Sequence, residues 1–152
     1  MLATACALSA LPVQASTNML VDGGLEYQPM SPMSSPPLAI HTYIGGCITT
    51  GSGVHWMNES LGYFTDPTGI YAIDLADYGY ANGGIKHSFA TTVGGLYSVS
   101  FAGMAYKNAG NPDGKGEITA LIDNHAIQTY QLLNQSSASN AWQSFNFTFS
   151  AA

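Results

Sequence analysis

Large apolar residues alternate with small or polar ones along most of this chain. The clearest case is GGIKHSFATTVGGLYSVSFAG, residues 83–103, where every second position from Ile85 to Phe89 and from Tyr97 to Phe101 is large. A period of two indicates strands with one buried and one solvated face. The Val-Gly-Gly between the runs supplies the positive φ angles that a chain reversal needs. The pattern predicts two core strands joined by a tight turn, as in a hairpin.

Similar short runs recur along the chain and are separated by turn residues. No long amphipathic helix is evident, and Gly, Pro, Asn and Asp punctuate the runs, as in TDPTG, YANGG and NAGNPDGKG. Many short strands at such spacing are typical of an antiparallel sandwich or jelly roll. We therefore expect an all-β chain with a single β-sandwich domain over residues 16–152. The runs are LAIHTYI, GVHWM, GIYAIDL, GIKHSFA, LYSVSFAGMAY, EITALI, HAIQTYQLL and WQSFNFTF.

The N-terminal segment predicts export. Residues 1–15, MLATACALSALPVQA, are apolar and uncharged and end in an A-x-A-like cleavage site. The segment is too short to span a membrane. Cleavage after Ala15 would leave Cys47 as the single cysteine, which excludes an internal disulfide. A proline-rich stretch at 28–37 follows, where extended or turn conformations are expected.

Charge is scarce, which excludes one class of partner. Only 8% of the residues are charged, with three lysines, no arginine and nine acids, giving a net charge of -6. Nucleic-acid binding needs side chains that neutralise phosphates, so this class is excluded. A surface rich in Ser, Thr, Asn, Gly and Tyr suits a secreted protein, extracellular or at the cell surface, with neutral partners. The alternative is that the low charge reflects only habitat or an assembled state.

Several motifs resemble one family of secreted proteins. MLVDGGLEY (19–27) resembles the opening of galactose-binding-like sandwiches, and TGIYAIDL, residues 83–103, NAGNPDG and AWQSFNFTFSA follow in the order of bacterial choice-of-anchor C proteins. These are relatives of a plant cell-wall family of unknown function. The resemblance covers roughly residues 18–151. It implies a secreted jelly-roll sandwich without established catalysis, in which related folds bind polysaccharide and carry structural calcium. Asp22-Gly23-Gly24-Leu25-Glu26 departs from the family's opening motif.

Three acids are candidates for a calcium site. Calcium takes six to eight oxygen ligands from carboxylates, amides and carbonyls. Glu26 matches the motif glutamate of sandwich carbohydrate-binding modules, Asp22 precedes it by four residues, and Asp74 lies inside the apolar run YAIDL. An acid in such a run needs a partner if it is buried. The alternative is that Glu26 and Asp74 accept backbone or hydroxyl hydrogen bonds and hold no metal.

Two loop-like segments are candidates for sugar binding. Exposed aromatic rings stack on the apolar faces of sugars, and amides and carboxylates orient the hydroxyl groups. Ordinary core packing is the alternative for each ring, and for Trp56 we weigh the two equally; Trp142 alternates with phenylalanines and is expected in the core. The first segment holds Trp56, Asn58, Tyr63 and Asp66, and the second holds Tyr78, Tyr80 and Asn82.

Catalytic motifs are weak, so we predict that the chain is not an enzyme. The four histidines lack zinc-binding spacing, and His87 is expected to be packed or hydrogen-bonded. Cys47 is expected to be a small buried thiol. The predicted function is therefore a non-catalytic secreted module that binds neutral polysaccharide or cell-surface glycan. The alternative is a structural subunit of an extracellular filament, sheath or matrix assembled by β-strand addition, with residues 1–15 as the donor strand.

Overall fold

The described part of the chain is built from β-strands. A computed structural model describes residues 17–20, 23, 25, 38–59, 71–76, 82–106, 112–132 and 142–152. Nearly all their regular structure is strand, and every strand pair is antiparallel. The all-β prediction is confirmed. The N-terminal segment 1–15 and the proline-rich stretch 28–37 lie outside the described residues.

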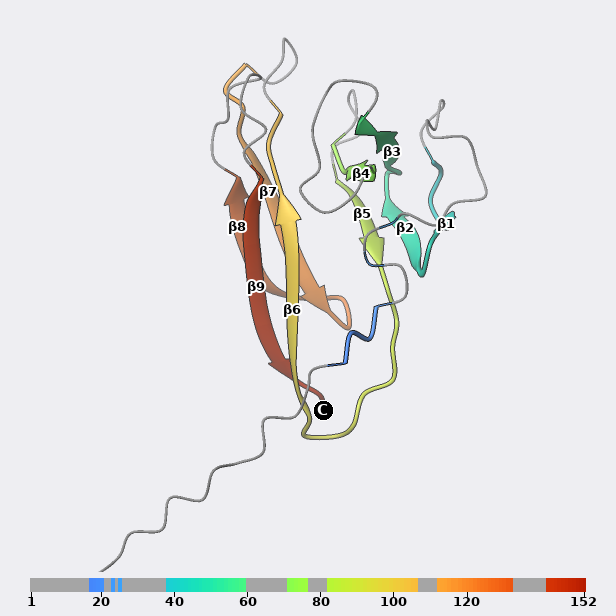
Figure 1. The fold of residues 1–152 in the computed structure, drawn as a ribbon, viewed down its shortest axis with the longest axis vertical. Helices are drawn as coiled ribbons and strands as arrows, with labels where there is room; N and C mark the ends of the chain where they lie inside the picture. The colour runs from blue at the N-terminus through green and yellow to red at the C-terminus, as the bar shows by residue number, and fades with distance from the viewer. Residues whose placement is uncertain are drawn as a thin grey trace, which may run out of the picture.

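The first five strands form two small sheets, on the right in Figure 1. Ile44, Val54 and Trp56 form their buried core, and Leu38 and Tyr71 pack against it. The shortness of these strands follows from the many glycines and turns between them. One sheet has the order β1-β2-β5, with β1 at Tyr43–Ile44, β2 at Cys47–Gly51 and β5 at Gly83–Lys86; the other pairs β3 at His55–Asn58 with β4 at Tyr71–Asp74.

The last four strands form two longer two-stranded sheets, on the left in Figure 1. The β7–β8 pair is a hairpin whose turn residues, Asp123 and Asn124, both have positive φ (49° and 64°). Such angles match the type I′ turn that favours right-handed strand twist. The second pair, β6 with β9, brings together strands on either side of this hairpin in the sequence. The bounds are β6 at Leu96–Gly103, β7 at Gly116–Ile122, β8 at His125–Leu132 and β9 at Gln143–Ser150.

An aromatic cluster joins the two longer sheets. Tyr130 of β8 has its ring centroid 5.2 Å from that of Phe101 on β6 and 5.0 Å from that of Phe145 on β9. Gly103 lies so close to the hairpin that an added Cβ would be 2.8 Å from Ile118 Cδ1. The period-two pattern of β6 and β9 therefore buries one face of this sheet against β7–β8, as expected for a strand with one apolar face.

The predicted hairpin over residues 83–103 is wrong in its pairing. The turn exists, since Gly95 N–H donates to Thr92 O at 2.8 Å and Gly94 has a φ of 74°. The strand after it exists as β6, but the strand before it ends at Lys86. However, β5 pairs with β2 and β6 pairs with β9, so the two strands lie in different sheets. The connecting segment stays extended after Lys86, and Ile85, predicted to be buried, is 39% exposed.

One strand was missing from the expected set. β2, CITTG, lies between glycines, and its central Thr49 is fully buried. The Thr49 hydroxyl donates to Ala39 O at 2.6 Å and accepts from the Thr42 amide at 2.9 Å. A threonine that satisfies its hydroxyl in this way can occupy a core position.

Candidate functional site

Trp56 lies in the core rather than on a binding platform. Its side chain is 2% exposed, and its ring stacks on Tyr71 with centroids 4.3 Å apart and planes 17° apart. It faces Ile73 across the β3–β4 pair. The prediction of Trp56 as a sugar platform is therefore wrong, and the packing alternative describes this ring.

The remaining predicted sugar contacts are not brought together within the described residues. Asn58 is half-buried and shares the core-facing side of β3 with Trp56, since alternate residues of a strand share a face. Asn82 is exposed, has a φ of 79° and leads into β5, near the Asp74 end of the β3–β4 pair. The two amides thus lie at opposite ends of that pair. Tyr63, Asp66, Tyr78 and Tyr80 lie outside the described residues.

Asp74 already has a backbone partner. Its Oδ1 accepts a hydrogen bond from the Ala76 amide at 2.9 Å, which fits the alternative weighed against a metal site. Asp74 is half-buried and faces His55 directly across the β3–β4 pair. Within the described ranges no group of three or more His, Cys, Asp or Glu side chains could hold a metal ion. The other two predicted ligands, Asp22 and Glu26, lie outside those ranges.

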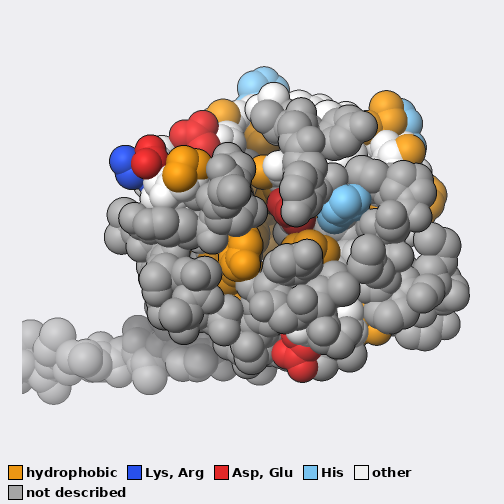
Figure 2. All heavy atoms as spheres, turned by 90° about the horizontal axis from the view of Figure 1, so that it is seen from above, with side chains coloured by type: hydrophobic (Ala, Val, Ile, Leu, Met, Phe, Trp, Pro, Cys, Tyr) orange, Lys and Arg blue, Asp and Glu red, His pale blue; other side chains and the backbone are white. Residues whose placement is uncertain are grey.

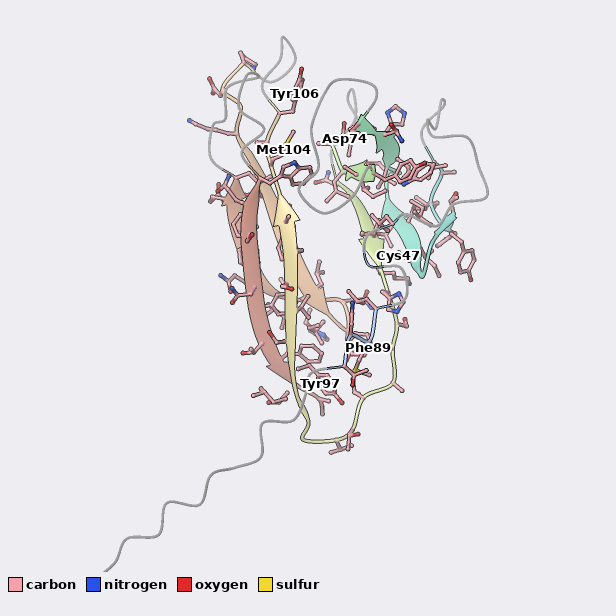
Figure 3. The ribbon with its side chains drawn as sticks, viewed as in Figure 1. Cys47, Asp74, Phe89, Tyr97, Met104 and Tyr106 are labelled. Atoms are coloured by element: carbon pink, nitrogen blue, oxygen red, sulfur yellow. The ribbon has the colours of Figure 1, made fainter. Side chains whose placement is uncertain are left out.

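Cys47 and His87 take structural positions. Cys47 is 8% exposed on β2, so the predicted buried thiol is confirmed. His87 is half-buried and its Nδ1–H donates to the carbonyl of Gly46, which confirms a hydrogen-bonded histidine. Figure 3 places Cys47 and Asp74 on different strands, β2 and β4, which belong to different sheets.

The outer face of the β6–β9 sheet is a largely polar surface without charge. We use this name for the exposed side chains of both strands, in which hydroxyl and amide groups predominate and no side chain is charged. The register places Ser98 opposite Thr148 and Ser100 opposite Asn146. The members are Leu96, Ser98, Ser100 and Ala102 on β6 and Ser144, Asn146, Thr148 and Ser150 on β9.

The outer face has a simple physical basis in the sequence. The period of two that buries Tyr97, Val99 and Phe101 must expose the residues between them. The alternation in the sequence is therefore sufficient to predict this surface. The signal that could have found it is that the polar positions of both strands are neutral.

The opposite hairpin presents a different outer face. On β7–β8, Thr119 Oγ1 and Thr129 Oγ1 lie 3.0 Å apart, and Gln131 Nε2 donates to Glu117 Oε2 at 3.0 Å. These polar side chains are engaged with one another across the strands. They leave fewer free hydrogen-bonding groups than the outer face of the β6–β9 sheet does, and they include a charge.

The end view in Figure 2 displays the scarcity of charge. Among the described side chains visible there, Lys or Arg lies at one edge beside acidic side chains, while histidine and acidic side chains are scattered between hydrophobic ones. No basic patch is formed by the described side chains in this view. Separately, no helix found in the described residues is both long and apolar enough to cross a membrane.

Comparisons with known proteins give no relative for this chain. No family model, no curated protein and no solved structure matches it. The resemblance to choice-of-anchor C proteins therefore stays a prediction.

Proposed function

We propose that this chain is a non-catalytic secreted module, extracellular or at the cell surface, that binds neutral polysaccharide or cell-surface glycan on a jelly-roll sandwich. One observation carries the proposal: the outer face of the β6–β9 sheet is polar, exposed and free of charge. Hydroxyl and amide groups exchange hydrogen bonds with sugar hydroxyls, and a neutral surface has no means of attracting a charged partner over a distance.

The loop residues complete this proposal. Sugar sites combine a few convergent polar groups with an aromatic ring. Tyr78 and Tyr80, next to Asn82, are the aromatic residues that we assign to this role now that Trp56 is buried. A structural calcium ion held by Asp22, Glu26 and Asp74 would stabilise the fold that presents these residues. For that ion, Asp74 retains one carboxylate oxygen beyond the bond to Ala76.

The test measures binding to insoluble neutral polysaccharides, namely cellulose, xylan and mannan, with acidic pectate as a comparison. We expect the full chain to bind one or more neutral polymers, and Asn146→Ala with Thr148→Ala to weaken binding about thirtyfold, since each of the two lost hydrogen bonds contributes about 1 kcal/mol. The matched control, Thr119→Ala with Thr129→Ala, removes a hydroxyl pair from the β7–β8 hairpin and should bind normally.

The outcomes separate the two parts of the proposal. If Tyr78→Ala with Tyr80→Ala abolishes binding while the outer-face variant binds normally, the loops hold the sugar and the outer face does not. If the full chain binds no neutral polysaccharide, glycan binding itself is wrong. Preference for pectate would equally contradict a neutral partner.

A structural subunit assembled by β-strand addition is the second candidate. The observation that favours it is the absence of charge from both β6 and β9, the two strands of the longest pairing in the described residues. Uncharged edge strands present unpaired backbone groups that another strand can add to.

A further inference from the structure

Among the described residues, one edge of the strand β6 is left without a partner strand and lacks the usual protection. Within the described residues it pairs with β9 and with no other strand. Its eight residues include no charge and no proline, and its pairing has no bulge. Soluble proteins normally protect long edge strands with such features. The β7–β8 hairpin has both a charge, Glu117, and a bulge that leaves Ile127 of β8 unpaired.

The far edge of β9, in contrast, is already covered. Tyr130 of β8 donates its hydroxyl to the carbonyl oxygen of Asn146 at 2.8 Å. Figure 1 shows β9 between β8 and β6, in agreement with the contacts that β9 makes with both. Of the two strands in this sheet, β6 therefore carries the edge that remains available for pairing.

We propose that β6 pairs with β6 of a second copy of this chain, antiparallel and about a two-fold axis. This inference shares with the second candidate function only the addition of one strand to another, and it goes beyond that function by naming the partner strand. A two-fold contact uses the same edge on both copies, so it closes on itself and yields a dimer rather than a filament. The product is a continuous four-stranded sheet with the order β9-β6-β6-β9.

The side-chain pattern fixes the register of this contact. Residues directly opposite each other in an antiparallel pair lie on the same face, so apolar positions must meet apolar ones. Gly103 has no side chain to contribute to a cross-strand pair, so the register that pairs the most side chains overlaps residues 96–102. Full overlap of that stretch places the axis at Val99. Tyr97 then faces Phe101 of the second copy, and Ser98 faces Ser100.

A second copy is the occupant that this edge fits best. With Val99 on the axis, aromatic residues meet on the buried side and hydroxyl groups meet on the exposed side, and aromatic cross-strand pairs stabilise sheets. The chain has a net charge of -6, yet β6 and β9 carry none of it, so the copies meet where they do not repel. The contact would also join the two outer faces into one wider neutral surface.

Register-specific cross-linking tests the proposal on the full chain without any glycan. Opposite Cα atoms in antiparallel strands are about 4.5 or 5.5 Å apart, within the range that a disulfide spans. We expect light scattering to give twice the chain mass. We further expect an oxidised mixture of Ser98→Cys and Ser100→Cys chains to form at least about fivefold more cross-linked dimer than either variant alone. The unchanged chain is the control for the native thiols, Cys6 and Cys47.

Two lysine variants identify the paired edge independently of the cross-linking experiment. Ser100→Lys puts two like charges beside the axis and should raise the dimer dissociation constant at least about tenfold. Asn146→Lys, which faces Ser100 across the β6–β9 pair, places the same charge one strand further in and should remain dimeric. Circular dichroism checks that both fold.

Four results would overturn the proposal. These are a monomeric chain, equal cross-linking in the mixture and in the single variants, equal sensitivity to the two lysines, and assemblies larger than a dimer. The last result would favour an open filament and so would retain strand addition while rejecting the closed β6 contact. None of them bears on glycan binding, which is measured separately.

Discussion

The hydroxyl of Tyr130 on β8 donates a hydrogen bond to the backbone carbonyl of Asn146 on β9, across a distance of 2.8 Å. Its ring meanwhile contacts those of Phe101 and Phe145. One side chain thus links the β7–β8 hairpin to the β6–β9 sheet both by packing and by a directed bond.

Removing only this hydroxyl should destabilise the fold modestly. We expect Tyr130→Phe to lower the free energy of unfolding by about 1 kcal/mol, because the carbonyl loses a partner in a part-buried site while the ring contacts stay. Urea denaturation followed by circular dichroism measures the change. Tyr97→Phe, whose hydroxyl accepts from the exposed Thr92 amide, is the control and should cost less. Equal losses would argue against a special role for Tyr130.

Replacement of Trp56 distinguishes its core position from a sugar platform. We expect Trp56→Ala to lower the free energy of unfolding by about 3–5 kcal/mol, because it leaves a cavity beside Tyr71. Trp56→Phe keeps much of the volume and should cost less. Chemical denaturation measures the free energy of unfolding of each variant. A stable alanine variant that binds glycan poorly would contradict the buried position.

Two glycines separate the cost of steric clash from the cost of backbone conformation. A Cβ on Gly83 would clash with the Gly53 carbonyl and lie 2.7 Å from Leu75 O, whereas at Gly94, with a φ of 74°, it would meet nothing within 4 Å. We therefore expect Gly94→Ala to cost about 1–2 kcal/mol, as left-handed backbone does for other residues. Gly83→Ala should cost clearly more. Thermal melts of the two variants show which is less stable. A larger loss at Gly94 than at Gly83 would contradict the close approach of Gly83 to the carbonyl groups of Gly53 and Leu75.

Calcium should raise the melting temperature of the full chain if the proposed ion is bound. Stabilisation by a ligand at one hundred times its dissociation constant is about 2.7 kcal/mol. We expect Asp74→Asn to remove most of this shift and the exposed Asp113→Asn to leave it intact. The comparison uses added calcium against a chelator. Identical melts of the unchanged chain in both conditions would contradict a calcium site.

The sequence predicted strand positions better than strand partners. The alternation around Tyr97 and Phe145 is a local property, because each residue's face follows from the pleat, and these strands lie where the pattern placed them. Pairing depends on residues far apart in sequence, so the expected hairpin of residues 83–103 divided between two sheets.

In the candidate site, too, local features could be predicted and features that depend on strand pairing could not. The local sequence around an aromatic residue does not show whether its ring is buried or exposed, so the position of Trp56 could not be predicted. Its stack on Tyr71 results from the β3–β4 pairing. The neutral outer face, in contrast, follows directly from the polar positions of β6 and β9. The loop residues Tyr78 and Tyr80 stay predictions.

The order of strands also determines how the chain reaches this structure. The β7–β8 hairpin closes through the two-residue turn at Asp123 and Asn124, and such local closure takes about 1–10 μs. The pairing of Leu96 with Ser150 has to enclose that whole hairpin, and contacts so distant in sequence slow folding. We therefore expect the hairpin to form before the β6–β9 sheet does. Until it forms, the uncharged β6 has no partner on either side, so newly made chains are most prone to aggregate in this interval.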